Sequence, residues 1–324
     1  MKKILIFGGG SGLSQILKGL KLFPLDITAV VSVSDNGRST GLLRKEMNIP
    51  AVGDITKVML SMANIDSDMQ ELLNYRFTKS KSLGNHSIKN LLLTALLDIK
   101  GNFASSLPIL ERMLDITNGK ILPLTEDSVN LVGITSKGKK VIGEEQITKC
   151  KDKIIKIEYN KDITVNPEVY KAVKSADLII FSSGSLYTSI IPHLINKDLV
   201  KAINNSHAKK LYICNLFTQP GETDGFKVSD HIKIIEQYLG KNKIDIVIAN
   251  SKPMSSTLSK KYSTDEQKDP VILDLEYLEK NNIYVISDLL YVVEDGYYRH
   301  DSLKTAYLIF SYLMDNNIWH LIRV

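Results

Sequence analysis

Short apolar segments alternate with longer amphipathic segments along this chain of 324 residues. This alternation constrains the fold more strongly than any other feature, because it is typical of strands joined by helices. Several of the short segments are apolar on both faces, as strands between two layers of helices must be. The pattern therefore predicts an α/β fold with a doubly wound, mostly parallel sheet. The candidate strands are Lys3–Phe7, Ile27–Val33, Val129–Ile134, Ile154–Ile157, Leu178–Ser182, Leu211–Cys214, Ile246–Ala249 and Tyr284–Ile286.

Capping residues between these strands indicate where helices begin and end. Asp54 precedes apolar residues at helical spacing, and we predict that it is an N-cap. Asn166 before Pro167 is typical of an N-cap followed by a proline at the first helical position. Ser229 is predicted to cap a helix that ends at Gly240, because glycine favours the C-terminal turn.

The charge balance and the cysteines exclude several classes of protein. Lys and Arg number 41 against 36 Asp and Glu, with no clustered basic face and interleaved aromatics, so we expect no nucleic-acid partner. The two cysteines, Cys150 and Cys214, are too few for a disulfide framework or a zinc–cysteine site. No apolar run approaches the roughly 20 residues of a membrane span, and Ile4–Phe7 is too short for a signal peptide. We therefore expect a cytoplasmic protein without a membrane span.

No internal repeat or low-complexity linker divides the chain, so we predict a single domain over residues 1–324. Residues 136–162 are rich in lysine and hairpin-like. We expect this segment to be a solvated excursion from the sheet.

The first predicted strand runs into a glycine-rich turn. Gly9, Gly10 and Gly12 allow close backbone approach, and with Ser11 they open a helix whose free N–H groups favour an anion. The turn predicts a phosphate-binding site, and the alternative is a tight strand-to-helix turn without a ligand. NAD is a less favoured ligand, because Gln15 stands where the dinucleotide fingerprint has glycine or alanine.

The second predicted strand ends in a polar loop that contains Asp35, Asn36, Arg38 and Ser39. Ligands of open α/β sheets bind at the carboxyl edge, where this loop must lie. Asp35 is suited to a ribose hydroxyl or a metal ion, and Arg38 is suited to a phosphate. The alternative is a turn with a surface arginine.

Other loops carry similar side chains. His86 and Asn90 lie on the first turn of an apolar helix, which suggests that they face a cavity, although a lone histidine is more often structural. A second turn of glycine and hydroxyl residues is able to cradle phosphate. Because several strand ends carry ligand-type residues, together they indicate one shared site more strongly than any single loop does. The further candidates are Gly184, Ser185, Tyr187, Thr188, Asn215, Thr223 and Asp224.

Taken together, these motifs resemble those of the YvcK/CofD-like family, in the same order and over nearly the whole chain. The resemblance implies a Rossmann-like, three-layer fold that binds a nucleotide-type ligand. The matching segments are Gly8–Ser14, Val33–Arg44, Val52–Asp54, Asn85–Asn90, Ser183–Pro192, Tyr212–Gly225 and Arg299–Asp301.

The resemblance implies two alternative functions. The resemblance to the YvcK branch implies a regulator that binds a UDP-sugar, such as UDP-N-acetylglucosamine. This regulator is tied to cell shape and to gluconeogenic growth. The other branch transfers a phospholactyl group to a deazaflavin precursor with a divalent metal, and here Asp35, Asp54 and Asp224 would surround Mg²⁺. Asn36 replaces the second acid of the family's Asp-Asp pair, which weakens a hard-cation site. Arg38 supplies phosphate-neutralising charge instead, and Lys89 does the same.

We therefore expect the regulator, with no tightly bound metal or cofactor. An NAD(P)-dependent oxidoreductase is a third, disfavoured alternative. Turnover and homo-oligomerisation are left open. From the resemblance we also expect Arg299 to clamp a ligand diphosphate from the entry loop of the last helix, the alternative being a surface pair with Glu294 or Asp295. Ser302 is then a candidate phosphorylation site. The expected ligand-binding residues are Gly9, Gly10, Ser11, Gly12, Asp35, Asn36, Arg38, Ser39, Asp54, His86, Asn90, Gly184, Ser185, Tyr187, Thr188, Asn215, Thr223, Asp224 and Arg299.

Overall fold

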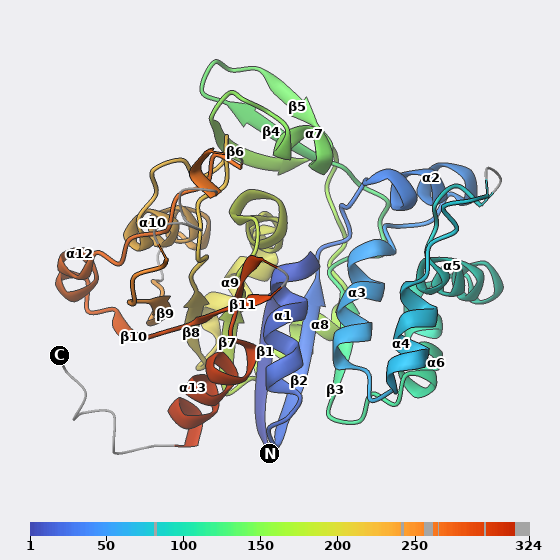
Figure 1. The fold of residues 1–324 in the computed structure, drawn as a ribbon, viewed down its shortest axis with the longest axis horizontal. Helices are drawn as coiled ribbons and strands as arrows, with labels where there is room; N and C mark the ends of the chain where they lie inside the picture. Colours follow the sequence, from blue (N-terminus) through green and yellow to red (C-terminus); the bar gives the residue numbers. More distant parts are fainter. Residues whose placement is uncertain (81–82, 241–242, 256–261, 265, 295, 315–324) are drawn as a thin grey trace.

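The computed structural model describes residues 1–80, 83–240, 243–255, 262–264, 266–294 and 296–314, with the side chain of Arg38 outside that description. A seven-stranded sheet with the strand order β10-β9-β8-β7-β1-β2-β3 forms its centre, and all neighbouring strands are parallel. Helices cover both faces (Figure 1), which confirms the three-layer, Rossmann-like α/β fold. The strands are β1 Lys2–Gly8, β2 Leu25–Val31, β3 Gly119–Pro123, β7 Leu178–Phe181, β8 Lys209–Ile213, β9 Ile246–Asn250 and β10 Tyr284–Asp288.

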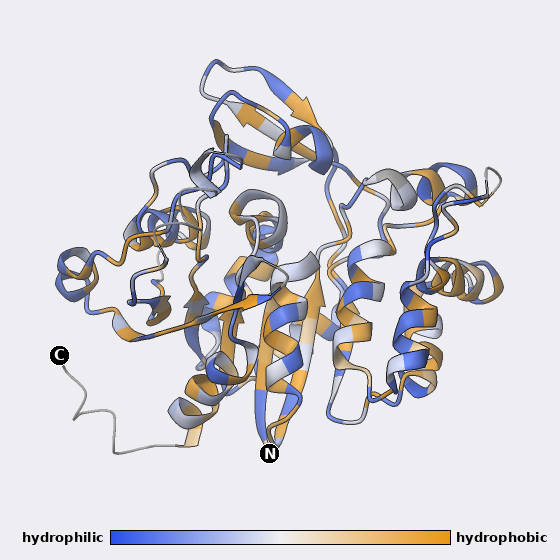
Figure 2. Cartoon of the chain, viewed as in Figure 1, coloured by the Kyte–Doolittle hydropathy of each residue, from blue (hydrophilic) through white to orange (hydrophobic). Residues whose placement is uncertain are grey.

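Strand β1 shows why the sheet is covered on both faces. Ile4 and Ile6 enter one hydrophobic core, whereas Leu5 and Phe7 enter the other, and all four are buried. Because side chains alternate along a strand, a strand that is apolar at every position needs helices on both sides. Figure 2 shows the resulting apolar band along the central strands. Burial of each such side chain contributes roughly 1.5–3 kcal/mol.

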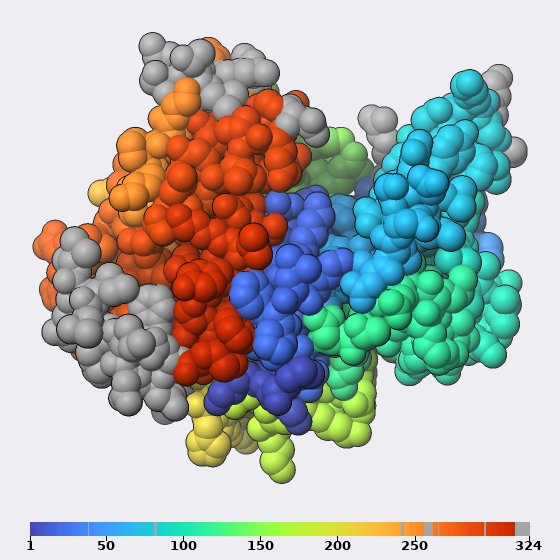
Figure 3. All heavy atoms as spheres, turned by 60° about the horizontal axis from the view of Figure 1, so that its bottom comes forward, coloured from blue at the N-terminus to red at the C-terminus, as the bar shows by residue number. Residues whose placement is uncertain are grey.

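The helices divide between the two cores. Figure 3 shows α13 against α1, an approach that Gly19 permits, since a methyl group there would overlap the carbonyl oxygen of Ser302. Among the described residues, every helix is too short or too polar to span a bilayer. The core of Ile4 is covered by α1 Gly10–Leu20, α2 Arg38–Met47, α3 Gly53–Met62, α4 Ser67–Asn74, α5 Ile88–Lys100, α6 Phe103–Met113 and α13 Ser302–Met314. The core of Leu5 is covered by α8 Pro167–Ser175, α9 Lys197–Asn205, α10 Val228–Leu239 and α12 Leu275–Lys280.

The lysine-rich segment forms a small antiparallel sheet with the order β5-β4-β6. Its elements are β4 Leu131–Thr135, β5 Lys140–Ile142, the short helix α7 Glu144–Thr148 and β6 Ile154–Tyr159. The sequence-based strands at 129–134 and 154–157 therefore exist, but they lie here and not in the central sheet. The lysines are exposed as expected, yet Ile147, Ile154 and Ile157 are buried. The small sheet lies over the carboxyl edge of the central sheet (Figure 1).

Four strands were not predicted, and each is short or at an edge. β3 pairs only with β2, and an edge position tolerates its Pro123. β5 pairs only with β4 at the edge of the small sheet. The other two, β11 Tyr291–Glu294 and β12 Tyr297–His300, form a separate hairpin before α13.

The predicted helix ends are confirmed in part. Asn166 caps α8 by accepting a hydrogen bond from the N–H of Glu168, and α10 ends at Gly240 as expected. Asp54 is not an N-cap, because α3 begins one residue earlier, with Val52 as its cap. Ser229 also lies inside its helix, since the cap of α10 is Lys227.

Candidate functional site

The glycine turn after β1 forms the N-terminus of α1 at the carboxyl edge of the central sheet. Gly10 has a φ of +56°, a left-handed conformation that favours glycine. α1 has no cap from its N-cap residue and no acid in its first turn, so its N-terminal N–H groups are suited to an anion. The backbone of Gly10 already makes a hydrogen bond with the carboxylate of Asp54. A methyl group built at Gly9 would lie 3.1 Å from Oδ2 of Asp54, and one at Gly10 would lie 3.3 Å from Oδ1. The Asp54 carboxylate therefore lies beside this turn.

Gly12 has a packing role that the sequence did not predict. A methyl group there would overlap the carbonyl oxygen of Ser183 and lie 2.9 Å from Cα of Gly184. α1 and the turn after β7 are thus in backbone contact at this point. Ser11, between the glycines, is exposed.

The loop after β2 brings Asp35 close to α3 and Asn36 close to the small sheet. Oδ1 of Asp35 accepts a hydrogen bond from the N–H of Gly37 at 2.8 Å. Its Oδ2 faces α3, since a methyl group at Gly53 would lie 2.5 Å away. Oδ1 of Asn36 accepts a hydrogen bond from the N–H of Glu145 at 3.0 Å. Asn36 therefore holds the start of α7 against the edge of the central sheet.

Through this contact α7 places Glu144 at the edge, and sequence reasoning missed this residue. Burial raises the pKa of Glu144 well above its usual range, and repulsion from Asp54 and Asp35 adds to the effect. A hydrogen bond with the side chain of Thr188 acts in the opposite direction. The available sequence signal was an acid directly after a glycine, within a segment whose lysines indicated a solvated loop.

The turn after β7 is held by side chains from the loop that follows the neighbouring strand β8. Asn215 donates to the carbonyl oxygen of Gly184 at 2.7 Å and accepts from its N–H at 2.9 Å. Oγ of Ser185 donates to Oε2 of Glu222 at 2.6 Å and accepts from the N–H of Thr188 at 3.0 Å. Glu222, which sequence reasoning also missed, is 1% exposed. Burial raises the pKa of Glu222, and the hydrogen bond from Ser185 opposes only part of this rise.

The edge thus carries the carboxyl groups of Asp35, Asp54, Glu144 and Glu222, and burial raises the pKa of the last three. Burial raises the pKa of Asp54 to about 6, with added repulsion from Asp35, although an ion pair with Lys57 at 3.7 Å opposes the shift. Within the described residues, no three acidic, histidine or cysteine side chains stand in an arrangement suited to a metal ion.

A hydrogen-bond network on the α3 and α5 side of the edge contains three of the predicted residues. Oγ of Ser39 is 2.8 Å from Nδ1 of His86, and the Asn90 amide donates to the same hydroxyl at 3.3 Å. Oδ1 of Asn90 accepts from the hydroxyl of Thr56 at 2.7 Å. His86 and Asn90 are 6% and 4% exposed. Both side chains are thus bonded to protein hydroxyl groups in the interior, and their role in binding a ligand stays a prediction.

Lys89, a cation that was expected to neutralise phosphate, lies in the first turn of α5. Burial, with repulsion from Lys57 and Arg76, lowers the pKa of Lys89 to about 8. Its ammonium group donates to Oδ1 of Asn74 at 2.5 Å. The side chain of Arg38, which was expected to add charge here, lies outside the described residues.

Three predicted residues are engaged in local structure. Oγ1 of Thr223 accepts from the N–H of Gln219 at 2.8 Å, and Thr223 is fully buried. Asp224 is exposed, and its carboxylate accepts from the N–H of Gly221 at 2.7 Å. Tyr187 is buried, which raises its pKa to about 12.

Arg299 lies on strand β12, not on the entry loop of α13 as expected. The hairpin with β11 extends to His300, so that Asp301 alone separates the strand from the helix. The Arg299 side chain is exposed, and its guanidinium carbon lies 5.7 Å from the ring centroid of Tyr297. Asp301 accepts a hydrogen bond from the N–H of Lys304 at 2.9 Å, as the N-cap of α13 does.

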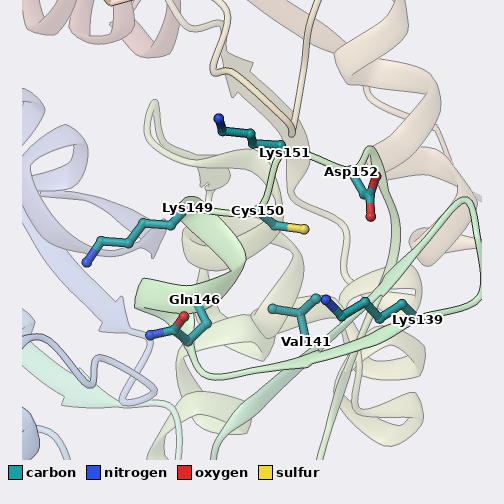
Figure 4. A pocket seen from close by; sticks show the side chains of 7 residues that line it. All are labelled: Lys139, Val141, Gln146, Lys149, Cys150, Lys151 and Asp152. Atoms are coloured by element: carbon teal, nitrogen blue, oxygen red, sulfur yellow. The ribbon is translucent and has the colours of Figure 1, made fainter.

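A cavity of about 350 Å³ lies on the small sheet, away from the predicted residues. Figure 4 shows the thiol of Cys150 and the ammonium group of Lys139 turned toward each other, whereas Lys149 and Lys151 extend outward. The glycine turn and the partly buried carboxyl groups lie at the carboxyl edge of the central sheet and not in this cavity. We therefore take that edge as the candidate site. The cavity is lined by Lys139, Val141, Gln146, Lys149, Cys150, Lys151 and Asp152.

Comparison with known proteins shows the family of this chain. The model of the family described as 2-phospho-L-lactate transferase CofD matches residues 4–291, which include every strand of the central sheet except the start of β1. The chain belongs to the CofD family.

Similar proteins match this chain over most of its length. A Thermotoga maritima relative is 43% identical over 312 residues, which is 95% of this chain and 98% of the relative. A Bacillus subtilis relative named gluconeogenesis factor is 38% identical, over 97% of this chain and 98% of that protein. A crystal structure of a UPF0052 family member from Bacillus halodurans is 38% identical, with a TM-score of 0.91 over 95% of this chain and 99% of that one.

Proposed function

We propose that this CofD-family protein is a cytoplasmic regulator that binds a UDP-sugar and links gluconeogenic growth to cell shape and cell-wall homeostasis. The observation that carries the proposal is the N-terminus of α1 behind Gly9 and Gly10, at the edge where ligands of parallel sheets bind. The name gluconeogenesis factor, which similar proteins carry, supports the physiological part.

The second candidate is a metal-dependent transferase of the kind that the family description names. The carboxyl groups at the edge favour it, but the three acids expected around Mg²⁺ do not fit this role as they stand. Asp224 is exposed and turned onto its own loop, and Asn36, in place of the family's second acid, is bonded to α7. We therefore derive no step through a metal.

A ligand screen separates the candidates. We expect UDP-sugars to stabilise the protein without being consumed, by about 2.7 kcal/mol at a hundred times Kd. The screen includes GDP compounds, NAD(P) and Mg²⁺, each with product analysis. Metal-dependent consumption of a nucleotide substrate would establish the transferase. Stabilisation by NAD(P) alone would contradict both candidates.

Gly9→Ala tests the glycine turn as the ligand-binding element. The φ of Gly9 is −164°, which any residue adopts, and the added methyl group would face Asp54 and lie 3.5 Å from Oγ of Ser189. We expect little change in unfolding temperature and a loss of UDP-sugar binding of at least about tenfold, which corresponds to 1.4 kcal/mol. Isothermal titration calorimetry measures the affinity. Wild-type binding by Gly9→Ala would remove the turn from the site.

Arg299→Ala tests the expected diphosphate clamp. A charge-assisted hydrogen bond contributes roughly 1.5–3 kcal/mol. Because Arg299 is exposed, we expect the lower part of this range, an affinity loss of about tenfold, with unchanged fold stability. Arg112→Ala, at an exposed position on α6, is the matched control. Equal affinities of the two variants would return Arg299 to the role of a surface residue.

A further inference from the structure

The hydroxyl group of Ser189 at the candidate site has no hydrogen-bond partner within the described part of the chain. The residue is nevertheless buried, with 8% of its surface exposed. Its Oγ is not among the unpartnered atoms that are sealed from solvent, as that of Ser183 is. Because most buried hydroxyl groups are bonded to protein or to ordered water, this one is available to a molecule that enters the site.

Ser189 lies where the turn after β1 meets the turn after β7. A methyl group built at Gly9 would lie 3.5 Å from its Oγ. One built at Gly184 would lie 3.8 Å from the same atom and 3.9 Å from the carbonyl oxygen of Gly9. A side chain at either glycine would therefore cover the hydroxyl group. The candidates that the sequence indicated in this turn ended at Thr188, one residue earlier.

A wide helical turn places Ser189 at this junction. The π-helix η1 Leu186–Ile190 follows its cap Ser185. The carbonyl oxygen of Ser185 accepts from the N–H of Ser189 at 3.0 Å and from that of Ile190, five residues on, at 3.2 Å. Leu186 and Ile190 are fully buried in the core and fix the turn. Turns of this kind are frequent at functional sites, and here the turn directs a polar side chain to the two glycines.

Asp54 approaches the same place from α3. The methyl group built at Gly9 would also lie 3.1 Å from Oδ2 of Asp54, so a donor and an acceptor lie within 3.5 Å of one point beside Gly9. A carboxylate only accepts hydrogen bonds, whereas a hydroxyl group donates as well as accepts. A phosphate oxygen at this point would accept from Ser189 but would be repelled by the Asp54 carboxylate. A hydroxyl group would satisfy both, because it donates to Asp54 and accepts from Ser189.

We propose that Ser189 and Asp54 together bind a sugar hydroxyl group of the ligand beside Gly9, with Ser189 as the donor and Asp54 as the acceptor. The phosphates are then left to the N–H groups at the start of α1. The identity of the ligand as a nucleotide sugar rests on the proposed function. The assignment also explains the loss of binding expected for Gly9→Ala, because the added methyl group would take the place of the hydroxyl group.

Ser189→Ala tests the assignment by titration calorimetry with UDP-N-acetylglucosamine. The full chain is used at pH 8, where Asp54 is ionised because its pKa is about 6. We expect the affinity to fall about three- to tenfold, as for the loss of one neutral hydrogen bond. The Tm should stay within about 1 °C of the wild type, because the hydroxyl group has no partner in the described part of the protein.

Thr305→Val is the matched control. It removes another buried hydroxyl group that lacks a partner among the described residues. Its helix α13 meets α1 at Gly19, away from the glycine turn, so the variant should bind as the wild type does. Wild-type affinity of Ser189→Ala, or an equal loss of affinity in Thr305→Val, would overturn the proposal.

A double-mutant cycle with Asp54→Asn shows whether one ligand group contacts both side chains. We expect Ser189→Ala to reduce affinity less in the Asp54→Asn background than in the wild type, because changes that share a contact are not additive. Additive effects would contradict a shared hydroxyl group.

Two shorter ligands identify the sugar that supplies the hydroxyl group. An effect of Ser189→Ala that vanishes with UDP assigns the group to the sugar beyond the diphosphate. An effect that persists with UDP and vanishes with dideoxyuridine diphosphate, which lacks both ribose hydroxyl groups, assigns it to the ribose. An effect that persists with the dideoxy compound would overturn the assignment to a sugar hydroxyl group.

Failure of the proposed function is distinguishable from failure of this inference. If the wild type binds no UDP-sugar, the proposed function fails. The Ser189→Ala and Thr305→Val variants are then compared with the GDP compound or the NAD(P) that stabilises the protein in the screen. A loss of affinity confined to Ser189→Ala supports the hydroxyl site, and equal affinities overturn it. If none of these compounds stabilises the protein, both proposals fail.

Discussion

Gly12→Ala is expected to lower the free energy of unfolding by about 3 kcal/mol, at the upper end of the range for overpacked positions. The added methyl group would overlap the carbonyl oxygen of Ser183 and come within 2.9 Å of Cα of Gly184. Both neighbours are backbone atoms, so no side-chain rotation relieves the overlap. α1 would have to move away from the turn after β7, and the contacts of Leu13 and Leu17 in the core would be lost with it.

Thermal unfolding followed by circular dichroism measures this effect. A loss of this size in a chain of this length corresponds to a decrease in Tm of roughly 4–5 °C. Ser11→Ala is the matched control, because it changes the adjacent, exposed residue and should leave Tm within about 1–2 °C of the wild type. From the sequence alone, a larger residue at Gly12 should abolish ligand binding and leave the fold intact. The structure predicts damage to both, and a Gly12→Ala protein with wild-type Tm would contradict the backbone contact.

Asp54→Asn is expected to stabilise the protein at pH 7 by about 1–3 kcal/mol. Folding raises the pKa of Asp54 from 3.8 to about 6, chiefly by burial and then by repulsion from Asp35. The folded protein thus binds this proton more tightly than the unfolded chain does. The stability that comes from this proton is complete below about pH 4 and is lost as the pH rises through about 6. The asparagine variant has no charge to shield and escapes the loss.

Urea unfolding between pH 4 and pH 8 tests this prediction. The stability difference between Asp54→Asn and the wild type should be near zero or slightly negative at pH 4 and grow toward pH 7. The variant also loses an ion pair with the partly exposed Lys57, worth about 0–1 kcal/mol, and a favourable charge in the first turn of α3. Asp68→Asn, in the exposed first turn of α4, measures how much a negative charge in the first turn of a helix contributes to stability. A difference that does not change with pH would contradict the shifted ionisation of Asp54.

Local patterns predicted the fold and the nearest part of the candidate site. The strands β1, β2, β7, β8, β9 and β10 contain the apolar runs on which the prediction depended. In β1, Ile4 and Leu5 enter the cores on opposite faces of the sheet. The cap at Asn166 depends on residues next to it in sequence and was also correct. The cap at Asp54 was wrong, because the same residue type suits the first turn of a helix as well as its cap.

The sequence by itself determined that the chain forms a parallel α/β sheet with a glycine turn at the N-terminus of its first helix, because periodicity and turn chemistry act over a few residues. Only the tertiary structure decided which polar groups share the edge of that sheet. The bond between the N–H of Glu145 and Asn36 joins residues 109 positions apart, and the bond between Ser185 and Glu222 joins residues 37 apart. No local pattern encodes such pairs. They form because the core brings distant segments together, and the same packing removes the water that would otherwise keep Asp54, Glu144 and Glu222 at their ordinary pKa values.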